Sequence, residues 1–281
     1  MFEIIESYML APNVHMLKVA AADIAREAQP GQFIIVRAEE EGERIPLSLS
    51  DWDAEEGTVT MIFVVVGRTT NTLSQLKAGM SLPTVAGPLG NPLEIKHFGT
   101  ALCLGGCYGI GSIYPIARAL KAHDNKVIIA IEAKSSFLLY WEEKLASVSD
   151  QIIRITRDGS AVGYRGHVDQ MTDIMRSFDE PVDWMVANGC NMLMMKGAHA
   201  SLPLGIPTQV CLNTIMIDGT GMCGVCRVTI GDDTKFACVD GPYFDGHQVN
   251  WDELFQRRKM YIREEVISMR SSRGERSMEL C

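Results

Sequence analysis

The chain has 281 residues, and at about 150 residues per domain this length predicts two domains with room for a small third region. Hydrophobic residues make up 47% of it and charged residues 22%, a globular composition that excludes disorder as the main state. The 26 basic and 35 acidic residues give a net charge of −9 without a long basic run. An electrostatic nucleic-acid interface is therefore not expected.

A membrane span and a secretory signal are not expected either. The longest apolar stretch, residues 61–66, is far shorter than the ~20 residues that cross a bilayer. Glu3 and Glu6 lie where a signal peptide carries positive charge. We therefore expect a cytoplasmic protein whose eight cysteines are metal ligands or buried thiols rather than disulfides.

Residues 1–98 alternate apolar and polar side chains over short runs that turn residues separate. Val, Ile and Phe dominate these runs, as they do in half-buried strands. The pattern predicts an antiparallel β-barrel domain with one helix near residues 71–76. Its expected strands include 14–19, 33–36, 59–66 and 82–85.

From residue 99 to 212, buried-strand candidates alternate with helical segments. This alternation predicts an α/β domain built on a parallel sheet. The expected strands are 101–104, 127–131, 152–156, 182–187 and 208–212, with helices at 112–122 and 137–146.

Residues 213–281 follow neither pattern and form a predicted C-terminal appendage. A loop rich in glycine and cysteine leads to a short hairpin and then to a charged helix at about residues 251–269. The region is too small to build its own core, so a metal centre is a reasonable means of holding it together.

The strongest motif is Asp218-x4-Cys223-x2-Cys226-x11-Cys238. Soft thiolates select zinc or iron–sulfur centres. The spacing is that of a plant-type [2Fe–2S] site, with aspartate in the first ligand position. It predicts such a cluster at these four residues, and the alternatives are a structural zinc site or cysteines that are merely buried.

A second motif lies at the end of a barrel strand, with turns at 66–70 and 87–92 further on. An arginine beside a proline-stiffened strand can pair with a pyrophosphate, and a nearby serine hydroxyl can reach the edge of a flavin ring. The alternative is a surface cation beside ordinary turns. The motif reads Arg44-Ile45-Pro46-Leu47-Ser48-Leu49.

A third motif, residues 104–112, is a glycine-rich turn between a predicted strand and a predicted helix. Backbone N–H groups in such a turn can bind phosphate, although the spacing is not strictly G-x-G-x-x-G. Residues 156–160, at the end of a later strand, offer hydroxyls and a cation to a ribose or phosphate, or else form a capped turn.

Taken together, the order of barrel, α/β domain and cysteine region resembles the ferredoxin–NADP reductase superfamily. Within it the chain looks like the electron-transfer subunits of dihydroorotate dehydrogenase B. It is more similar still to the small subunits of NADH-dependent reduced ferredoxin:NADP oxidoreductases, also called sulfide dehydrogenases. The specific marks are residues 216–224, 236–242 and 244–247, and the dihydroorotate type has cysteine where Asp218 stands.

This resemblance implies one FAD against the barrel, a [2Fe–2S] cluster held by the four residues of the cysteine motif, and NAD(H) over the α/β domain. The FAD would contact Arg44, Pro46, Leu47, Ser48, Leu49, Gly67, Thr69 and Thr70. The nucleotide would contact Gly105, Gly106, Gly109, Thr156, Asp158 and Gly159.

The chain departs from the family at the nucleotide site. The usual phosphate loop is Gly-Gly-Gly-x-Gly-x-Ala-Pro. In this chain Cys107 occupies the position of the third glycine, and Ser112-Ile113 replaces Ala-Pro. A second nucleotide motif lacks its usual proline after Gly189. Because Cys107 adds a side chain where the family has none, we expect weakened or altered nucleotide binding.

The implied electron path runs from NAD(H) to FAD, to the cluster and to a larger subunit with its own flavin and [4Fe–4S] clusters. That subunit would in turn serve ferredoxin in an electron-bifurcating transhydrogenase. One alternative is the electron-transfer subunit of another NAD(P)H-linked complex, of the dihydroorotate dehydrogenase or glutamate synthase type. Another is a non-catalytic relay that has lost nucleotide binding. No side chain is predicted to act as a catalytic group.

Overall fold

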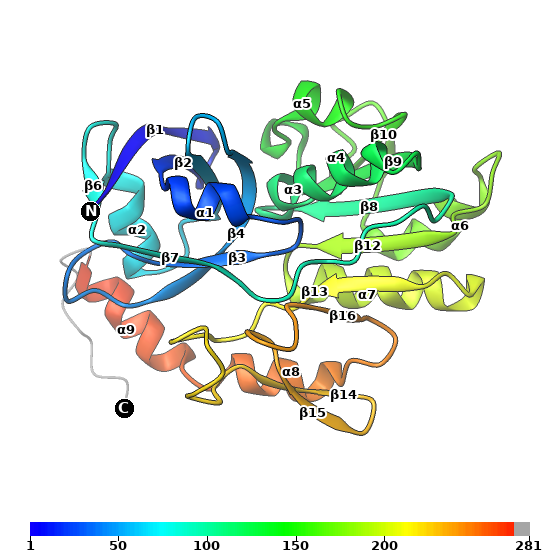
Figure 1. Ribbon diagram of the computed structural model, residues 1–281. Helices are drawn as coiled ribbons and strands as arrows, with labels where there is room; N and C mark the ends of the chain where they lie inside the picture. The colour runs from blue at the N-terminus through cyan, green and yellow to red at the C-terminus, as the bar shows by residue number, and fades with distance from the viewer. Residues whose placement is uncertain (273–281) are drawn as a thin grey trace.

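The computed structural model describes residues 1–272, and Cys281 lies outside the described residues. Figure 1 shows two sheets side by side, the first in blue to cyan and the second in green to yellow, with the C-terminal region below them in yellow to red. None of the helices in the described part of the chain is long and apolar enough to cross a membrane.

The first sheet is an antiparallel, nearly closed barrel, as predicted. Its strand order is β6-β1-β2-β5-β4-β3-β7. Only Pro83 separates β6 from β7, although they are the two edges of the sheet, so the edges must lie close together. The strands are β1 (Phe2–Ala11), β2 (Val14–Ala20), β3 (Phe33–Arg37), β4 (Ile45–Asp53), β5 (Thr58–Val64), β6 (Ser81–Leu82) and β7 (Thr84–Leu89).

Alternation along the barrel strands builds the barrel core. Leu17, Val19 and Met61 are fully buried there, whereas their neighbours Met16 and Ile62 are buried in the cluster shared with the second sheet. Two helices, α1 (Ala22–Glu27) and α2 (Arg68–Gln75), accompany the strands. The second is the helix expected near residues 71–76, and the first was not expected.

The second sheet has the order β11-β10-β9-β8-β12-β13-β16. Its central strands are buried along almost their whole length because helices cover both faces. The parallel sheet predicted for residues 99–212 is confirmed, because β8 to β13 pair in parallel, and β16 from the C-terminal region adds one antiparallel strand at the edge. The strands are β8 (Thr100–Gly106), β9 (Lys126–Ala133), β10 (Gln151–Thr156), β11 (Tyr164–Arg165), β12 (Trp184–Asn188), β13 (Thr208–Cys211) and β16 (Tyr243–Asp245).

Helices on the two faces divide the interior of this sheet into two clusters. Residues of α3, α4 and α5 share one cluster with barrel residues, and those of α6, α7 and α8 share the other with the cysteine region. The helices between the strands are α3 (Gly109–Ser112), α4 (Tyr114–Ala122), α5 (Glu142–Ala146), α6 (Met171–Arg176) and α7 (Asn191–Ser201), with 3₁₀ turns at Ser136–Leu138, Val168–Gln170 and Leu202–Leu204.

A small charge network joins the barrel to the second sheet. Asp51 on β4 accepts from Arg118 of α4 at 2.8 Å and from Lys144 of α5 at 2.5 Å. The Asp51 side chain is only 17% exposed, so solvent screens these pairs less than it screens ordinary surface pairs. The network helps to fix the orientation of the two sheets around the sites described below.

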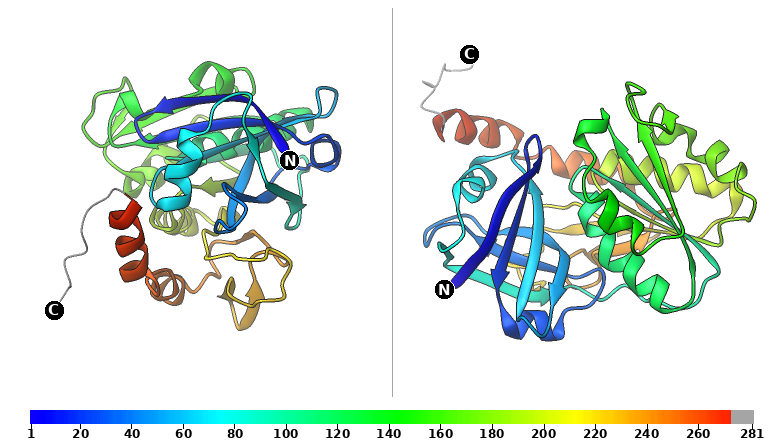
Figure 2. Two further views of the ribbon diagram at one scale, coloured as in Figure 1. Left: turned by 90° about the vertical axis from the view of Figure 1, so that its left-hand side faces the viewer. Right: turned by 90° about the horizontal axis from the view of Figure 1, so that it is seen from above.

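The C-terminal region contains the expected hairpin, β14 (Arg227–Ile230) and β15 (Asp233–Phe236). The single helix expected over 251–269 is instead two helices, α8 (Trp251–Arg258) and α9 (Ile262–Ser272). The α8 helix buries one face against β14, and the break after it lets α9 return to the barrel and contact α2. Figure 2 shows this return.

Candidate functional site

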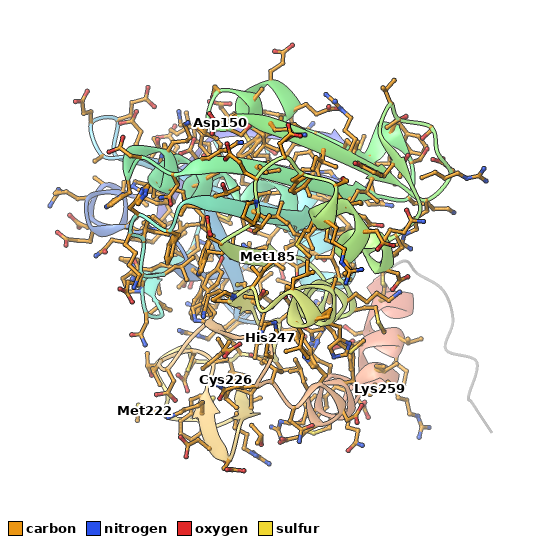
Figure 3. All side chains as sticks on the ribbon, turned by 90° about the vertical axis from the view of Figure 1, so that its right-hand side faces the viewer. Asp150, Met185, Met222, Cys226, His247 and Lys259 are labelled. Atoms are coloured by element: carbon orange, nitrogen blue, oxygen red, sulfur yellow. The ribbon has the colours of Figure 1, made fainter. Side chains whose placement is uncertain are left out.

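The four residues of the cysteine motif lie in the cluster loop, which we define as residues 212–242, between β13 and β16. One pair is internal: Sγ of Cys226 and Sγ of Cys238 are 3.2 Å apart, and both residues are only 1% exposed. Burial, reinforced by Cys226, raises the pKa of Cys238 to about 12. Figure 3 places Cys226 inside this region and Met222 at its outer margin.

The second pair is Asp218 and Cys223. The carboxylate accepts from the Cys223 backbone N–H at 2.8 Å, and also from the backbone and hydroxyl of Thr220. Hydrogen bonding, with the Cys223 thiol as the largest cause, holds the pKa of Asp218 well below its usual range. The side chain is therefore an anion at neutral pH.

Glycines shape the backbone around these pairs. Gly219, Gly221 and Gly224 have φ of +80°, +85° and +65°, which glycine adopts without strain. At Gly219 a β-carbon would also come within 2.9 Å of Leu89 on β7, so the loop lies directly against the barrel.

The arrangement of the two pairs bears on which metal centre the loop suits. No three ligand-type side chains surround a common point within residues 1–272. A structural zinc ion needs four ligands around a single centre. A [2Fe–2S] cluster instead takes two protein ligands at each of two irons, and two separate pairs fit that requirement.

The flavin motif lies on β4 and shows strand alternation. Leu49 is 2% exposed and belongs to the barrel core, with Leu47 packed against the same core. Pro46 and Ser48 alternate with them and lie on the other face of the strand. The Ser48 hydroxyl contacts the thiol of Cys211 on β13, so this face looks toward the second sheet.

Arg44 connects the flavin motif to the cluster loop. Its Nε donates to the carbonyl of Ile217 at 3.0 Å, and its Nη2 donates to the carbonyl of Asp218 at 3.3 Å. Two of its five donors are therefore used inside the protein, and the others remain for an anion.

The third part of the expected FAD site is the N-terminus of α2. Thr70 Oγ1 accepts from the backbone N–H groups of Val66 and Gly67, both at 3.0 Å. Thr69 Oγ1 donates to the carboxylate of Glu43, the neighbour of Arg44, at 2.6 Å. These bonds tie the turn at Gly67 to the strand that carries the flavin motif.

The expected phosphate-binding turn is here called the nucleotide loop, residues 105–113. Gly105, Gly106 and Gly109 are all buried. A β-carbon at Gly106 would lie 2.2 Å from Leu193, and one at Gly109 would lie 2.1 Å from the carbonyl oxygen of Asn188. These glycines therefore allow the loop to pack closely against β12 and α7. A phosphate-binding turn is not the only role that their missing side chains serve.

Cys107 is exposed and has φ of +57°, the conformation that a glycine would favour. The hydroxyl of Tyr140 donates to the Cys107 carbonyl at 2.8 Å and accepts from the Gly111 N–H at 3.1 Å. The hydroxyl of Tyr108 donates to the Gly189 carbonyl at 2.5 Å. Two tyrosines therefore hold the nucleotide loop in place.

The residues after β10 form a capped turn. Thr156 is fully buried, and its hydroxyl accepts from the Ala161 N–H at 3.2 Å. Hydrogen bonds from Ser135 and Ser160 lower the pKa of Asp158 to about 2, so this exposed carboxylate is ionised. Gly159 has φ of +72°, which completes the turn.

Sequence reasoning missed Glu132 beside the nucleotide loop, although residues 156–160 had offered the cation of Arg157. Glu132 is the penultimate residue of β9, its side chain is only 4% exposed, and Arg157 pairs with it at 2.8 Å. A carboxylate directly after the apolar run 127–131 was the available signal. Cys190, at the start of α7, is a third residue at this edge of the sheet and is exposed.

Comparisons with known proteins agree with this architecture. The sequence model for the iron-sulfur cluster binding domain of dihydroorotate dehydrogenase B matches residues 213–250. A dihydroorotate dehydrogenase B (NAD(+)) electron transfer subunit homolog from Thermotoga maritima is 42% identical over 267 residues, covering 95% of this chain and 93% of that protein. The corresponding subunit from Desulforamulus reducens is 29% identical and covers 89% and 97%.

Among solved structures, a chain of the NADH-dependent reduced ferredoxin-NADP oxidoreductase, which was described for flavin-based electron bifurcation, is 41% identical with a TM-score of 0.89 and 95% coverage of both chains. Phthalate dioxygenase reductase, at 13% identity and a TM-score of 0.58, shares the fold alone. The chain therefore belongs to the family of dihydroorotate dehydrogenase B-type electron-transfer subunits, as an oxidoreductase subunit with an iron–sulfur-binding region and a ferredoxin-reductase-like fold.

Proposed function

We propose that this chain carries electrons between NAD(H), FAD and a [2Fe–2S] cluster, and from the cluster to a larger partner subunit. The observation that carries the proposal is the double hydrogen bond from Arg44 to the backbone of Ile217 and Asp218. The flavin motif and the cluster loop are neighbours held by one side chain, as electron transfer between their cofactors requires. When bound, FAD takes two electrons as hydride and releases them singly to a one-electron cluster.

In this proposal Asp218 and Cys223 hold one iron, and Cys226 and Cys238 hold the other. The separate pairs support that division because each iron of the cluster takes two protein ligands. Asp218 offers an anionic oxygen without releasing a proton, since its pKa is already low.

At the flavin, the free donors of Arg44 would bind the pyrophosphate and the Ser48 hydroxyl would reach the ring edge. Leu49 would not contact the flavin and would support the site only by packing in the barrel core. Residues 1–98 would then be the flavin domain, 99–212 the nucleotide domain and 213–281 the cluster region, whose last residues lie outside the described part. The protein would act in the cytoplasm, where the thiols of the cluster loop stay reduced.

The nucleotide would lie at the carboxyl edge of the second sheet, near Arg157 and Asp158. One observation favours a second candidate, a relay that does not bind nucleotide: Gly106 and Gly109 are buried, and Cys107 occupies a glycine position. Titration of the flavoprotein with NADH and with NADPH separates the two. Stoichiometric bleaching by either nucleotide supports the first candidate, and an inert flavin supports the relay.

The partner we propose is a larger subunit that carries its own flavin and [4Fe–4S] clusters and passes electrons to ferredoxin in a bifurcating complex. The outer tip of the cluster loop supports a partner there, because Met222 is 90% exposed and Ile217 is 49% exposed. Co-purification of the complex and cofactor analysis of the larger chain test this. A partner without a [4Fe–4S] cluster would favour another NAD(P)H-linked complex.

The ligand assignment is tested by metal analysis and by Asp218→Cys. We expect about two irons and two acid-labile sulfides per chain. The variant should retain the cluster with a changed electron paramagnetic resonance spectrum and a shifted reduction potential, because sulfur donates more electron density than oxygen. Zinc without labile sulfide would overturn the assignment.

Asp240→Asn is the matched control for this variant. Asp240 lies in the same loop and accepts from the backbone N–H of Phe236 at 2.6 Å, as Asp218 does from Cys223. It is not a proposed ligand, so the spectrum of this variant should equal that of the unchanged protein. Equal spectra for Asp218→Cys and the control would show that Asp218 only shapes the loop.

A further inference from the structure

Two cysteines outside the cluster loop stand in register at the carboxyl edge of the second sheet. Gly105 of β8 pairs with Asn188 of the parallel strand β12. Cys107 and Cys190 each lie two residues beyond that pair. Adjacent strands run about 4.8 Å apart, and a disulfide needs Cα atoms roughly 4.4–6.8 Å apart. The register therefore places the two residues side by side where β8 and β12 end, and their thiols are close enough to interact electrostatically.

Contacts beside the two cysteines hold their loops against each other. Tyr108 donates its hydroxyl hydrogen to the Gly189 carbonyl at 2.5 Å. A β-carbon at Gly189 would lie 2.8 Å from the carbonyl oxygen of Gly106. Both cysteines are nevertheless exposed, so a small reagent can reach them.

The backbone of Cys107 adds a second argument. Its φ of +57° is a conformation in which any β-carbon is strained and glycine is not. A side chain at such a position costs conformational energy. This cost is a reason to look for a function of Cys107.

A charged pair lies beside the two thiols. Arg157 lies close enough to interact electrostatically with both Cys107 and Cys190, and Glu132 holds its guanidinium. Protein atoms packed around Cys107 raise the pKa of its thiol, and Arg157 acts in the opposite direction. The Arg157 side chain is half-exposed and can attract the carboxylates of an anionic small disulfide.

We propose that Cys107 and Cys190 are a dithiol site that closes reversibly to a disulfide between the nucleotide loop and the start of α7. Two S–H bonds break, one S–S bond forms and two protons leave. The two electrons reduce a low-molecular-weight disulfide to two thiols. The bond would fix the two loops between which the nucleotide would lie, so the oxidised protein accepts hydride more slowly. This consequence rests on the proposed function, whereas formation of the disulfide does not.

Peptide mapping of the holoprotein tests the bond directly. After incubation with oxidised glutathione, alkylation and digestion by trypsin without reductant, we expect peptide 97–118 linked to peptide 177–196, and dithiothreitol should release it. Cys103 shares the first peptide but is fully buried, and Cys107→Ser should abolish the link. Two separately glutathionylated or two unmodified cysteines without a link would overturn the proposal.

Flavin bleaching by NADH provides the functional readout. The oxidised protein should react about tenfold or more slowly than the reduced protein, because only the competent fraction binds nucleotide. In Cys190→Ser the ratio of the two rates should be close to one. A linked peptide with an unchanged rate overturns the gating role. If NADH does not bleach even the reduced protein, the nucleotide step of the proposed function fails, and the peptide map still decides the disulfide.

Discussion

The cluster loop and the nucleotide loop are built from the same residue types, glycine and cysteine, and use them in opposite ways. In the cluster loop Gly219, Gly221 and Gly224 adopt positive φ, and two thiols face inward within 3.2 Å of each other. In the nucleotide loop the glycines serve close packing, and Cys107 holds the positive φ and is exposed. The same composition therefore yields a ligand cradle in one loop and a packed turn in the other.

The largest expected effect is on the inward-facing thiols. Cys226→Ser should remove the cluster and reduce iron and labile sulfide to near zero, because serine is a poor replacement for a buried thiolate. Cys190→Ser, which changes an exposed cysteine outside the loop, should retain both. Iron and sulfide assays on the two variants provide the measurement. Full iron content in Cys226→Ser would mean that the inward pair is only core packing.

Replacing a glycine of each loop by alanine should lower the free energy of unfolding by different amounts. Gly109→Ala should cost about 3 kcal/mol, because its β-carbon meets a backbone oxygen that cannot move aside. Gly224→Ala, with no neighbour closer than 3.6 Å, should cost only the ~1–2 kcal/mol of a left-handed residue. Denaturant unfolding of both variants checks the order, and the reverse order would contradict the comparison.

The loops also differ in what holds them, since Arg44 holds the cluster loop from the barrel. Arg44→Ala should remove a charge-assisted contact worth roughly 1.5–3 kcal/mol to the proposed FAD, which is about a 10- to 100-fold loss of flavin affinity. Flavin retention after dialysis measures this. Arg26→Ala, which removes an exposed arginine of α1 outside the flavin motif, is the control. Full flavin occupancy in Arg44→Ala would show that Arg44 only holds the cluster loop and does not bind FAD.

The smallest effect concerns the tyrosine that holds the nucleotide loop. Tyr140→Phe leaves the Cys107 carbonyl and the Gly111 N–H without their hydroxyl partner, which should cost about 1–2 kcal/mol. Tyr261→Phe, an exposed tyrosine, should cost nothing measurable. Unfolding curves for the two variants measure the difference, and equal values would show that the backbone bonds of the same two groups, from Ile110 N–H and to Tyr108 O, are sufficient.

Much of the fold follows from local pattern. Alternation predicted the barrel strands, and buried apolar runs predicted β8 to β10, because each pattern reflects which faces of a strand are covered. The strand β16 and the break between α8 and α9 depend on distant partners. A three-residue strand has no pattern of its own, and residues 259–261 contain no glycine or proline that would mark the break.

The sites show the same division. Spacing alone singled out Asp218 and the three cysteines as candidate ligands, and the structure adds that they lie in two pairs. The role of the glycines in the nucleotide loop could not be predicted from sequence. A glycine in a sequence does not show whether the fold uses its freedom of φ or its lack of a side chain. Glu132 was missed because its pairing with Arg157 joins two different strand ends.

The antiparallel pairing of β13 with β16 has a consequence for chain entropy. Cys211 pairs with Tyr243, so the cluster loop leaves the sheet and returns to it at neighbouring positions. Closing a flexible loop of about 30 residues costs on the order of 3 kcal/mol in lost conformations. The folded sheet already bears this cost, so a metal centre assembling in the loop does not have to meet it. The cluster loop is therefore an insertion whose two ends the sheet holds together.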